Sequence, residues 1–185
     1  MRENNANLRK DAGMRTRFII GLAVMSIWVL GGQLMFAQQT YDKAHAELAK
    51  MLTSAKVSLE EGLTASVREG TPISGKFETE EGQLQLSIYT MKGNVFSEVI
   101  VDHTTGHVTK VEPIASGEDF TAATAQRAAM VKAKKSLQTV VDAAVKTHAG
   151  SRAVSVFPVL KGERAAAEIT LFKDGAFVMV SDSLE

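Results

Sequence analysis

The chain has 185 residues, of which 45% are hydrophobic and 23% are charged, a composition typical of globular proteins and unlike that of a disordered chain. Its formal charge is zero, but the first 37 residues hold five basic and two acidic side chains, so the remainder carries a net charge of −3. A mildly acidic body gives no electrostatic footprint for nucleic acid. The absence of cysteine excludes disulfides and thiolate metal sites.

The N-terminus has the pattern of an export signal. Residues 1–17 are polar and basic, and residues 18–37 are almost wholly apolar. Two outcomes stay open, because ~20 apolar residues can also span a bilayer as a retained anchor. Cleavage after Ala37 would place Met35 at a position where a small residue is preferred. In both cases the positive flank orients the apolar segment with its N-terminus in the cytoplasm. Residues 1–40 are therefore expected to form a cytoplasmic tip followed by a signal sequence or membrane anchor. We therefore expect the body to be periplasmic or otherwise extracytoplasmic, released or held in the inner membrane.

Two helices are predicted next. Apolar residues recur at helical spacing from Tyr41 to Lys56, which predicts an amphipathic helix. The segment Ser58-Leu-Glu-Glu61 then has the form of a capping box, in which the serine and the second glutamate satisfy each other's backbone N–H groups. It predicts a second helix that ends before Gly70 and Pro72.

Strands are expected at residues 73–80, 83–89 and 95–101. The second of these alternates without fault, which places its side chains on two opposite faces of a sheet. We expect one face to be core, formed by Leu84, Leu86 and Ile88. The other is expected to be wet, formed by Gln83, Gln85, Ser87 and Tyr89.

A β-hairpin follows, whose turn contains Asp102, Thr105 and Gly106. The aspartate can accept hydrogen bonds from backbone N–H groups ahead of it, and the glycine can supply the positive φ that returns the chain into the second strand. These residues therefore predict a structural turn. His103 and His107 flank it beside Asp102, so a metal site is an alternative. The turn already explains Asp102 and Gly106, and the structural explanation is preferred.

The order of helices followed by strands then restarts after a linker at residues 113–120. Ala133-Lys-Lys-Ser-Leu137 matches Ala55-Lys-Val-Ser-Leu59 at an offset of 78 residues, which argues for an internal repeat. Helical sequence runs from Phe120 and is followed by alternating segments at residues 153–160, 165–172 and 176–180. The copy stops before a closing strand. The sequence thus predicts an α+β fold with two tandem units, residues 41–112 and 121–185, each with helices packed on one face of an antiparallel sheet.

The hairpin also carries a resemblance to a known family. The pattern Val99-x-Val101-Asp102-x-x-Thr105-Gly106-x-Val108, preceded by a helix and an alternating strand, resembles the end of a PepSY domain. More distantly, two tandem helix-plus-sheet units resemble the architecture of β-lactamase inhibitor proteins. The resemblance implies an extracytoplasmic, non-enzymatic module, often associated with inhibition or regulation of peptidases.

The expected function is therefore protein binding without catalysis or a cofactor. A rigid sheet would present Gln83, Gln85, Ser87 and Tyr89 to another protein, such as a peptidase, and block or position it. The alternative is an accessory subunit of an inner-membrane complex, anchored through residues 18–37. An enzyme is placed third and last, because no catalytic set of residues is visible in the sequence.

Overall fold

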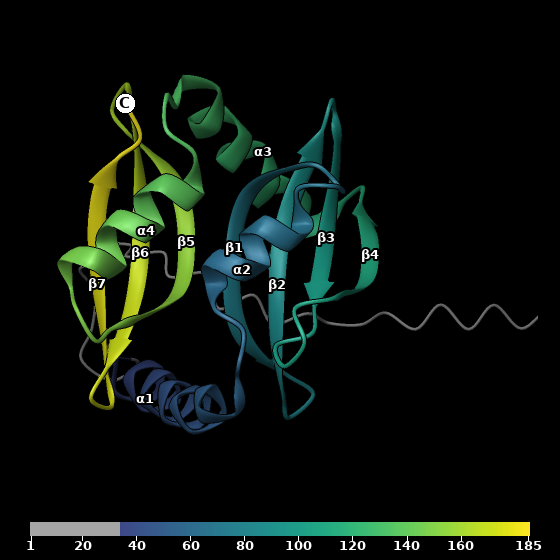
Figure 1. The fold of residues 1–185 in the computed structure, drawn as a ribbon. Coiled ribbons are helices and arrows are strands. Elements are labelled where there is room, and N and C mark those ends of the chain that lie inside the picture. The colour runs from purple at the N-terminus through teal and green to yellow at the C-terminus, as the bar shows by residue number, and fades with distance from the viewer. Residues whose placement is uncertain (1–33) are drawn as a thin grey trace, which may run out of the picture.

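Seven strands form one antiparallel sheet in the computed structural model, which describes residues 34–185 and the side chains from residue 43 onwards. The order across the sheet is β4-β3-β2-β1-β5-β6-β7, so the first strand of each half lies at its centre (Figure 1). The strands are β1 (Thr71–Glu80), β2 (Gln83–Lys92), β3 (Val95–Val101), β4 (Val108–Ile114), β5 (Arg152–Lys161), β6 (Arg164–Lys173) and β7 (Ala176–Ser183). The halves meet in a short antiparallel pairing, Gly75 with Val156 and Lys76 with Ser155.

Four α-helices pack around this sheet in the described part of the chain: α1 (Leu34–Met51), α2 (Leu59–Ser66), α3 (Gly117–Lys132) and α4 (Leu137–Thr147). Helices α2 and α4 lie side by side over one face, which we call the front face (Figure 1). Helix α3 lies behind the sheet, and α1 runs across one end of it. The molecule is α+β, as predicted.

The two front helices begin in the same way. Ser58 Oγ accepts a hydrogen bond of 3.1 Å from the N–H of Glu61, and the Glu61 carboxylate accepts one of 2.7 Å from the N–H of Ser58. The predicted capping box is therefore confirmed. Ser136 caps α4 with an equivalent bond of 3.1 Å from the N–H of Thr139. The two serines matched at the fixed offset thus occupy the same position in their helices.

The front face carries the main core. Leu84, Leu86 and Ile88 of β2 are buried there beneath Leu59 and Leu63 of α2, as the alternation predicted. The same cluster continues under α4 and onto β5 and β6, without a break between the halves. The apolar faces of α2 and α4 and the apolar side of the sheet therefore bury one another in a single cluster.

The opposite face, which we call the back face, differs from the prediction. Ala123 of α3 packs there in a second cluster with Ile73, Tyr89, Phe96 and Ile114, so helices cover both faces rather than one. The wet face expected along β2 is wrong for two of its four residues, since Ser87 is 0% exposed and Tyr89 only 9%. Tyr89 is covered because an aromatic ring beside other apolar side chains removes area from water.

Some boundaries also differ. The helix expected over residues 41–56 ends at Met51 and continues as a 3-10 turn, Leu52–Ser54. Strand β4 extends to Ile114, into the expected linker, and α3 begins at Gly117. None of the helices described here is both long and apolar enough to cross a membrane. The expected cytoplasmic tip and most of the expected signal or anchor, residues 1–33, lie outside the described residues.

Candidate functional site on the back face

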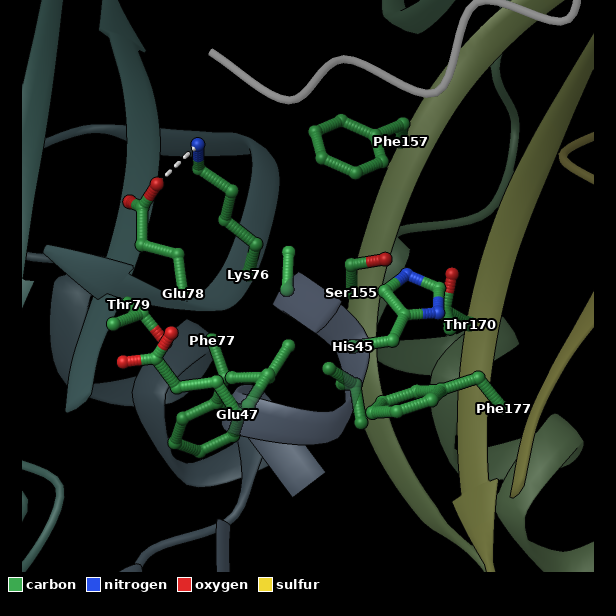
Figure 2. A pocket seen from close by; sticks show the side chains of 13 residues that line it. His45, Glu47, Lys76, Phe77, Glu78, Thr79, Ser155, Phe157, Thr170 and Phe177 are labelled. Carbon is green, nitrogen blue, oxygen red and sulfur yellow. Dashed lines mark ion pairs between the residues drawn. The ribbon is translucent and has the colours of Figure 1, made fainter. Parts of the chain in front are cut away.

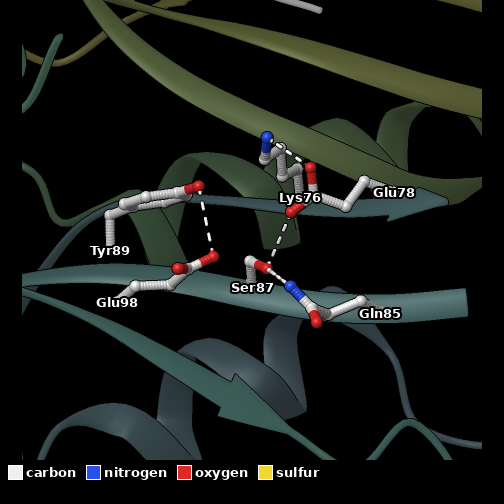
Figure 3. Close-up of polar contacts among 6 residues, drawn as sticks. All are labelled: Lys76, Glu78, Gln85, Ser87, Tyr89 and Glu98. Carbon is white, nitrogen blue, oxygen red and sulfur yellow. Dashed lines mark hydrogen bonds and ion pairs between the residues drawn. The ribbon is translucent and has the colours of Figure 1, made fainter. Parts of the chain in front are cut away.

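A chain of polar contacts crosses the back face from β1 to β2 (Figure 3). Lys76 Nζ lies 2.6 Å from Glu78 Oε2, and the other carboxylate oxygen of Glu78 accepts a 2.8 Å hydrogen bond from the Ser87 hydroxyl. Ser87 Oγ in turn accepts a 2.8 Å bond from the Gln85 amide. The charges of Lys76 and Glu78 therefore compensate each other, and each polar group in the chain has a partner.

The strand register places these side chains together. Ser87 lies opposite Lys76, and Gln85 lies opposite Glu78, in the antiparallel pairing of β1 with β2. Side chains directly opposite and diagonally adjacent on one face of such a pair are within reach of each other. Two of the four residues expected on a partner-binding face, Gln85 and Ser87, thus belong to a connected network, while Gln83 is exposed at the strand end.

The network continues towards β3 through an aromatic ring. Lys76 Nζ lies 5.8 Å from the centre of the Tyr89 ring, and the Tyr89 hydroxyl is 3.4 Å from Glu98 Oε1. Glu98 is buried although it carries a carboxyl group. Sequence reasoning missed it. The available signal was that Glu98 is the one acidic residue within the strand Val95–Val101. An acidic residue in an otherwise uncharged strand is a useful signal, since a buried polar residue is more informative than an exposed apolar one.

Beside the network lies a pocket of about 240 Å³ (Figure 2). Its walls come from α1, from β1 and from the β5–β7 half of the sheet, so residues distant in sequence converge on it. The lining combines aromatic, charged and hydroxyl side chains, including His45, Glu47, Lys76, Phe77, Glu78, Thr79, Ser155, Phe157, Thr170 and Phe177. Lys76 and Glu78 belong to both the pocket and the polar network.

Two hydroxyl groups lie on the strands that form one side of this pocket. Ser155 and Thr170 are opposite each other in the pairing of β5 with β6, and both residues are buried. Within residues 34–185, no hydrogen bond joins either hydroxyl group to another protein atom, and neither oxygen is fully enclosed, so both stay accessible from the pocket. A hydroxyl group that solvent reaches can exchange its hydrogen bond to water for one to a bound group. The pair can therefore donate to or accept from a group that enters the pocket.

Aromatic rings form the apolar part of the lining. The Phe177 ring lies 4.6 Å from that of His45 and 4.8 Å from that of Phe172, measured between ring centres. Phe157 projects from β5 on the other side of Ser155 (Figure 2). Rings flanking hydroxyl groups suit a guest with an apolar body and a polar tip.

The residues predicted to form a structural turn do so. Asp102 Oδ1 accepts hydrogen bonds of 2.8 Å from the N–H groups of both Thr104 and Thr105, and Gly106 has a φ of 77°. These backbone bonds are the main cause that lowers the pKa of the Asp102 carboxyl below its ordinary value. The His103 carbonyl accepts bonds of 2.9 and 3.0 Å from the N–H groups of Lys56 and Val57. The turn is therefore fastened to the segment that precedes α2.

The metal hypothesis for this hairpin rests on His103 and His107. Over residues 34–185, no group of three or more histidine, cysteine or acidic side chains is placed to hold a metal ion. The contacts of the turn run to residues 56–57 and not to the lining of the back-face pocket. The turn and the pocket are thus separate features of the molecule.

Comparison of the chain with known protein families, with curated proteins and with solved structures finds no match.

Proposed function

We propose that this chain is a non-enzymatic, extracytoplasmic protein-binding module built from two tandem PepSY-like units. The back-face pocket receives one side chain of a partner protein, and the surrounding sheet holds that partner in place. The observation that carries the proposal is the pocket lining, in which the accessible hydroxyl groups of Ser155 and Thr170 stand between phenylalanine rings and a self-compensated ion pair.

The tandem arrangement is supported by equivalent positions in the two halves. Ser58 and Ser136 cap the two front helices, and β1 and β5, the strands that follow these helices, are neighbours at the centre of the sheet. Each half then adds its later strands outwards, towards opposite edges. The described strands of the second half are β5, β6 and β7, which correspond to β1, β2 and β3.

Size and charge favour binding over catalysis. Pockets for whole small ligands usually span about 300–1,000 Å³, so a volume of about 240 Å³ suits part of a larger molecule. The ammonium group of Lys76 and the carboxylate of Glu78 neutralise each other at 2.6 Å, so this pair adds no net charge to the pocket. A side chain on a partner surface matches the pocket in size and in its mixed polarity.

The partner class follows from the PepSY resemblance and is a peptidase, whose access to substrate the module would block sterically. The alternative, an accessory subunit of an inner-membrane complex, uses the same pocket but requires residues 18–37 to remain as an anchor. The two roles differ in what binding does to the partner. Inhibition would lower a peptidase's turnover, whereas assembly would change the partner's stability or location.

Site-directed photocrosslinking in the host tests the proposal. A photoreactive phenylalanine at Phe157, on the pocket wall, should give one discrete adduct that the same group at Val95, an exposed residue on β3, does not give. The captured protein is then purified, and its binding to the parent is compared with binding to Thr170→Leu, which adds apolar bulk to the pocket. Loss of binding in a Thr170→Leu protein with unchanged circular dichroism would support the proposal. Equal adducts at both positions, or equal binding by both proteins, would contradict it.

A further inference from the structure

The pocket on the back face has an unbalanced charge. Its lining contains two carboxylates, Glu47 and Glu78, and one ammonium group, Lys76, which leaves one negative charge in excess when histidine is counted as neutral. The ion pair of Lys76 with Glu78 accounts for the positive charge and for one of the negative charges. The remaining charge belongs to Glu47, on α1. This surplus favours a cationic guest over a neutral or an anionic one.

The Glu47 carboxylate is available to such a guest. Glu47 is an exposed residue of the pocket lining (Figure 2), and within residues 34–185 no hydrogen bond or ion pair engages its carboxylate. Even Lys43 and Lys50, which lie about one turn away along α1, form no ion pair with it in the described part of the chain. A carboxylate in this position can pair with an incoming cation without giving up a protein partner.

An anionic guest would have to disrupt the existing ion pair. The side chains of Lys76 and Glu78 are only 12% and 18% exposed. One oxygen of Glu78 contacts Lys76, and the other accepts a 2.8 Å hydrogen bond from the Ser87 hydroxyl, so both oxygens are engaged. Drawing Lys76 away would leave Glu78 as a poorly solvated charge without its counter-ion, which is costly. The pocket therefore disfavours a carboxylate guest.

The rest of the lining suits the side chain of arginine. The hydroxyl oxygens of Ser155 and Thr170 can accept hydrogen bonds, and a guanidinium group carries five N–H donors in one plane. Phe157 and Phe177 stand on either side of these hydroxyl groups (Figure 2). A guanidinium group stacks on aromatic faces more readily than an ammonium group does. The aliphatic stem of arginine can cover the apolar part of the lining.

We infer that the pocket selects an arginine side chain of the partner protein. Glu47 supplies the opposite charge, and the hydroxyl groups of Ser155 and Thr170 supply hydrogen-bond acceptors. The inference rests on the proposed function, because it names the side chain that the proposed pocket receives. The charge of the guest is set by Glu47, and its flat shape is set by the phenylalanine rings.

NMR titration of the full-length protein in detergent micelles tests this selection without the partner. An isotope-labelled methyl group of Thr170 reports occupancy of the pocket. The probes are N-acetyl-arginine amide and N-acetyl-citrulline amide, which have nearly the same shape but differ in charge. The arginine probe should shift the Thr170 signal in a saturable way and bind at least about threefold more tightly than the citrulline probe, as pairing with an exposed carboxylate predicts. N-acetyl-lysine amide should bind more weakly than the arginine probe.

Two matched variants test the role of Glu47. Glu47→Gln should abolish the preference for arginine over citrulline, whereas Glu163→Gln, the same change at an exposed residue of the turn between β5 and β6, should keep it. The inference would be overturned by equal affinities of the arginine probe and either other probe in the parent. A preference that survives in Glu47→Gln, or no shift at Thr170 with any probe, would also overturn it.

These results are distinguishable from failure of the proposed function. A neutral probe that shifts the Thr170 signal as strongly as the arginine probe still occupies the pocket, so it removes the selection for charge and leaves the pocket as a binding site. The photocrosslinking at Phe157 tests separately whether a partner protein binds there.

Discussion

The Arg152 guanidinium, at the start of β5, donates a hydrogen bond of 3.0 Å to the carbonyl oxygen of Ala55, in the segment between α1 and α2. It also donates to the carbonyl oxygens of Leu52, at 3.1 Å, and Val57. The same group lies 5.1 Å from the centre of the Phe77 ring. One side chain of the second half thus satisfies three carbonyl groups of the first and joins the halves away from the short β1–β5 pairing.

Replacing Arg152 with alanine should destabilise the whole molecule. Hydrogen bonds from charged donors are stronger than neutral ones, and three carbonyl groups would lose this donor, so we expect a cost of about 2–4 kcal/mol. The Leu52 carbonyl would keep its bond from the Ala55 N–H. Lysine should recover only part of it, since it cannot present a planar fork to several acceptors. Chemical denaturation measures the effect. Arg164→Ala, at an exposed arginine of β6, is the control and should be nearly neutral; equal losses in both variants would refute a specific role for Arg152.

The two faces of β2 should respond differently to truncation. Leu86 is fully buried in the front core, and Leu86→Ala should cost ~2–5 kcal/mol. Gln85→Ala removes a single hydrogen bond, that to Ser87, and should cost only about 1 kcal/mol. The unfolding midpoints of the two variants in denaturant compare them directly. Coinciding midpoints would mean that the back-face network carries as much stability as the front core.

Gly62 lets α2 approach the sheet closely. A Cβ atom at this position would lie 2.7 Å from Leu86 Cδ2, closer than van der Waals contact allows. Gly62→Ala should therefore destabilise the protein by about 1–3 kcal/mol through overpacking, despite alanine's better helix propensity. In a Leu86→Ala background the clash is removed, so the same change should become neutral or stabilising. A double-mutant cycle measures this coupling, and additive effects would show that contact with Leu86 is not the cause of the destabilisation.

Gly106 should be sensitive to its backbone conformation rather than to space. A Cβ atom there would meet Val57 Cγ2 at 3.6 Å, an ordinary contact, but its φ of 77° disfavours β-branched side chains. Gly106→Val should cost about 1–3 kcal/mol, and Gly106→Asn should cost less, because asparagine tolerates this region better. Thermal unfolding of the two variants would rank them, and a valine variant as stable as the asparagine one would argue against the strained turn.

The contribution of Asp102 to the stability of the protein should decrease in acid. Its carboxylate accepts two backbone hydrogen bonds, so its pKa in the folded protein lies below the unfolded value of about 3.9. A lowered pKa means that the stabilisation is fully present above the unfolded pKa and is lost as the pH falls through the folded one. The stability difference between the parent and Asp102→Asn should therefore shrink on acidification below about pH 4. Denaturation over a pH series measures it, with Asp174→Asn, another turn substitution, as the control. A difference that does not change with pH would contradict this assignment.

The sequence was sufficient where structure depends on neighbours along the chain. The capping box at Ser58, the alternation that buries Leu86, and the turn at Asp102 and Gly106 were all predicted correctly. Each is a local matter, since side-chain-to-backbone bonds, the two-residue period of a strand and the φ of a glycine involve only a few consecutive residues. The α+β class followed from the order of such segments.

The tertiary structure decided what the second face of the sheet does. Alternation shows that Ser87 and Tyr89 point away from Leu86, but not that α3 lies behind the sheet and that the back-face cluster encloses Tyr89. The pocket needs Lys76 from one half and Thr170 from the other, nearly a hundred residues later in the chain. Its existence depends on the pairing of β1 with β5 and on the docking of α1, and no local pattern encodes these. Long-range packing brings them together because each half buries its remaining apolar surface against the other.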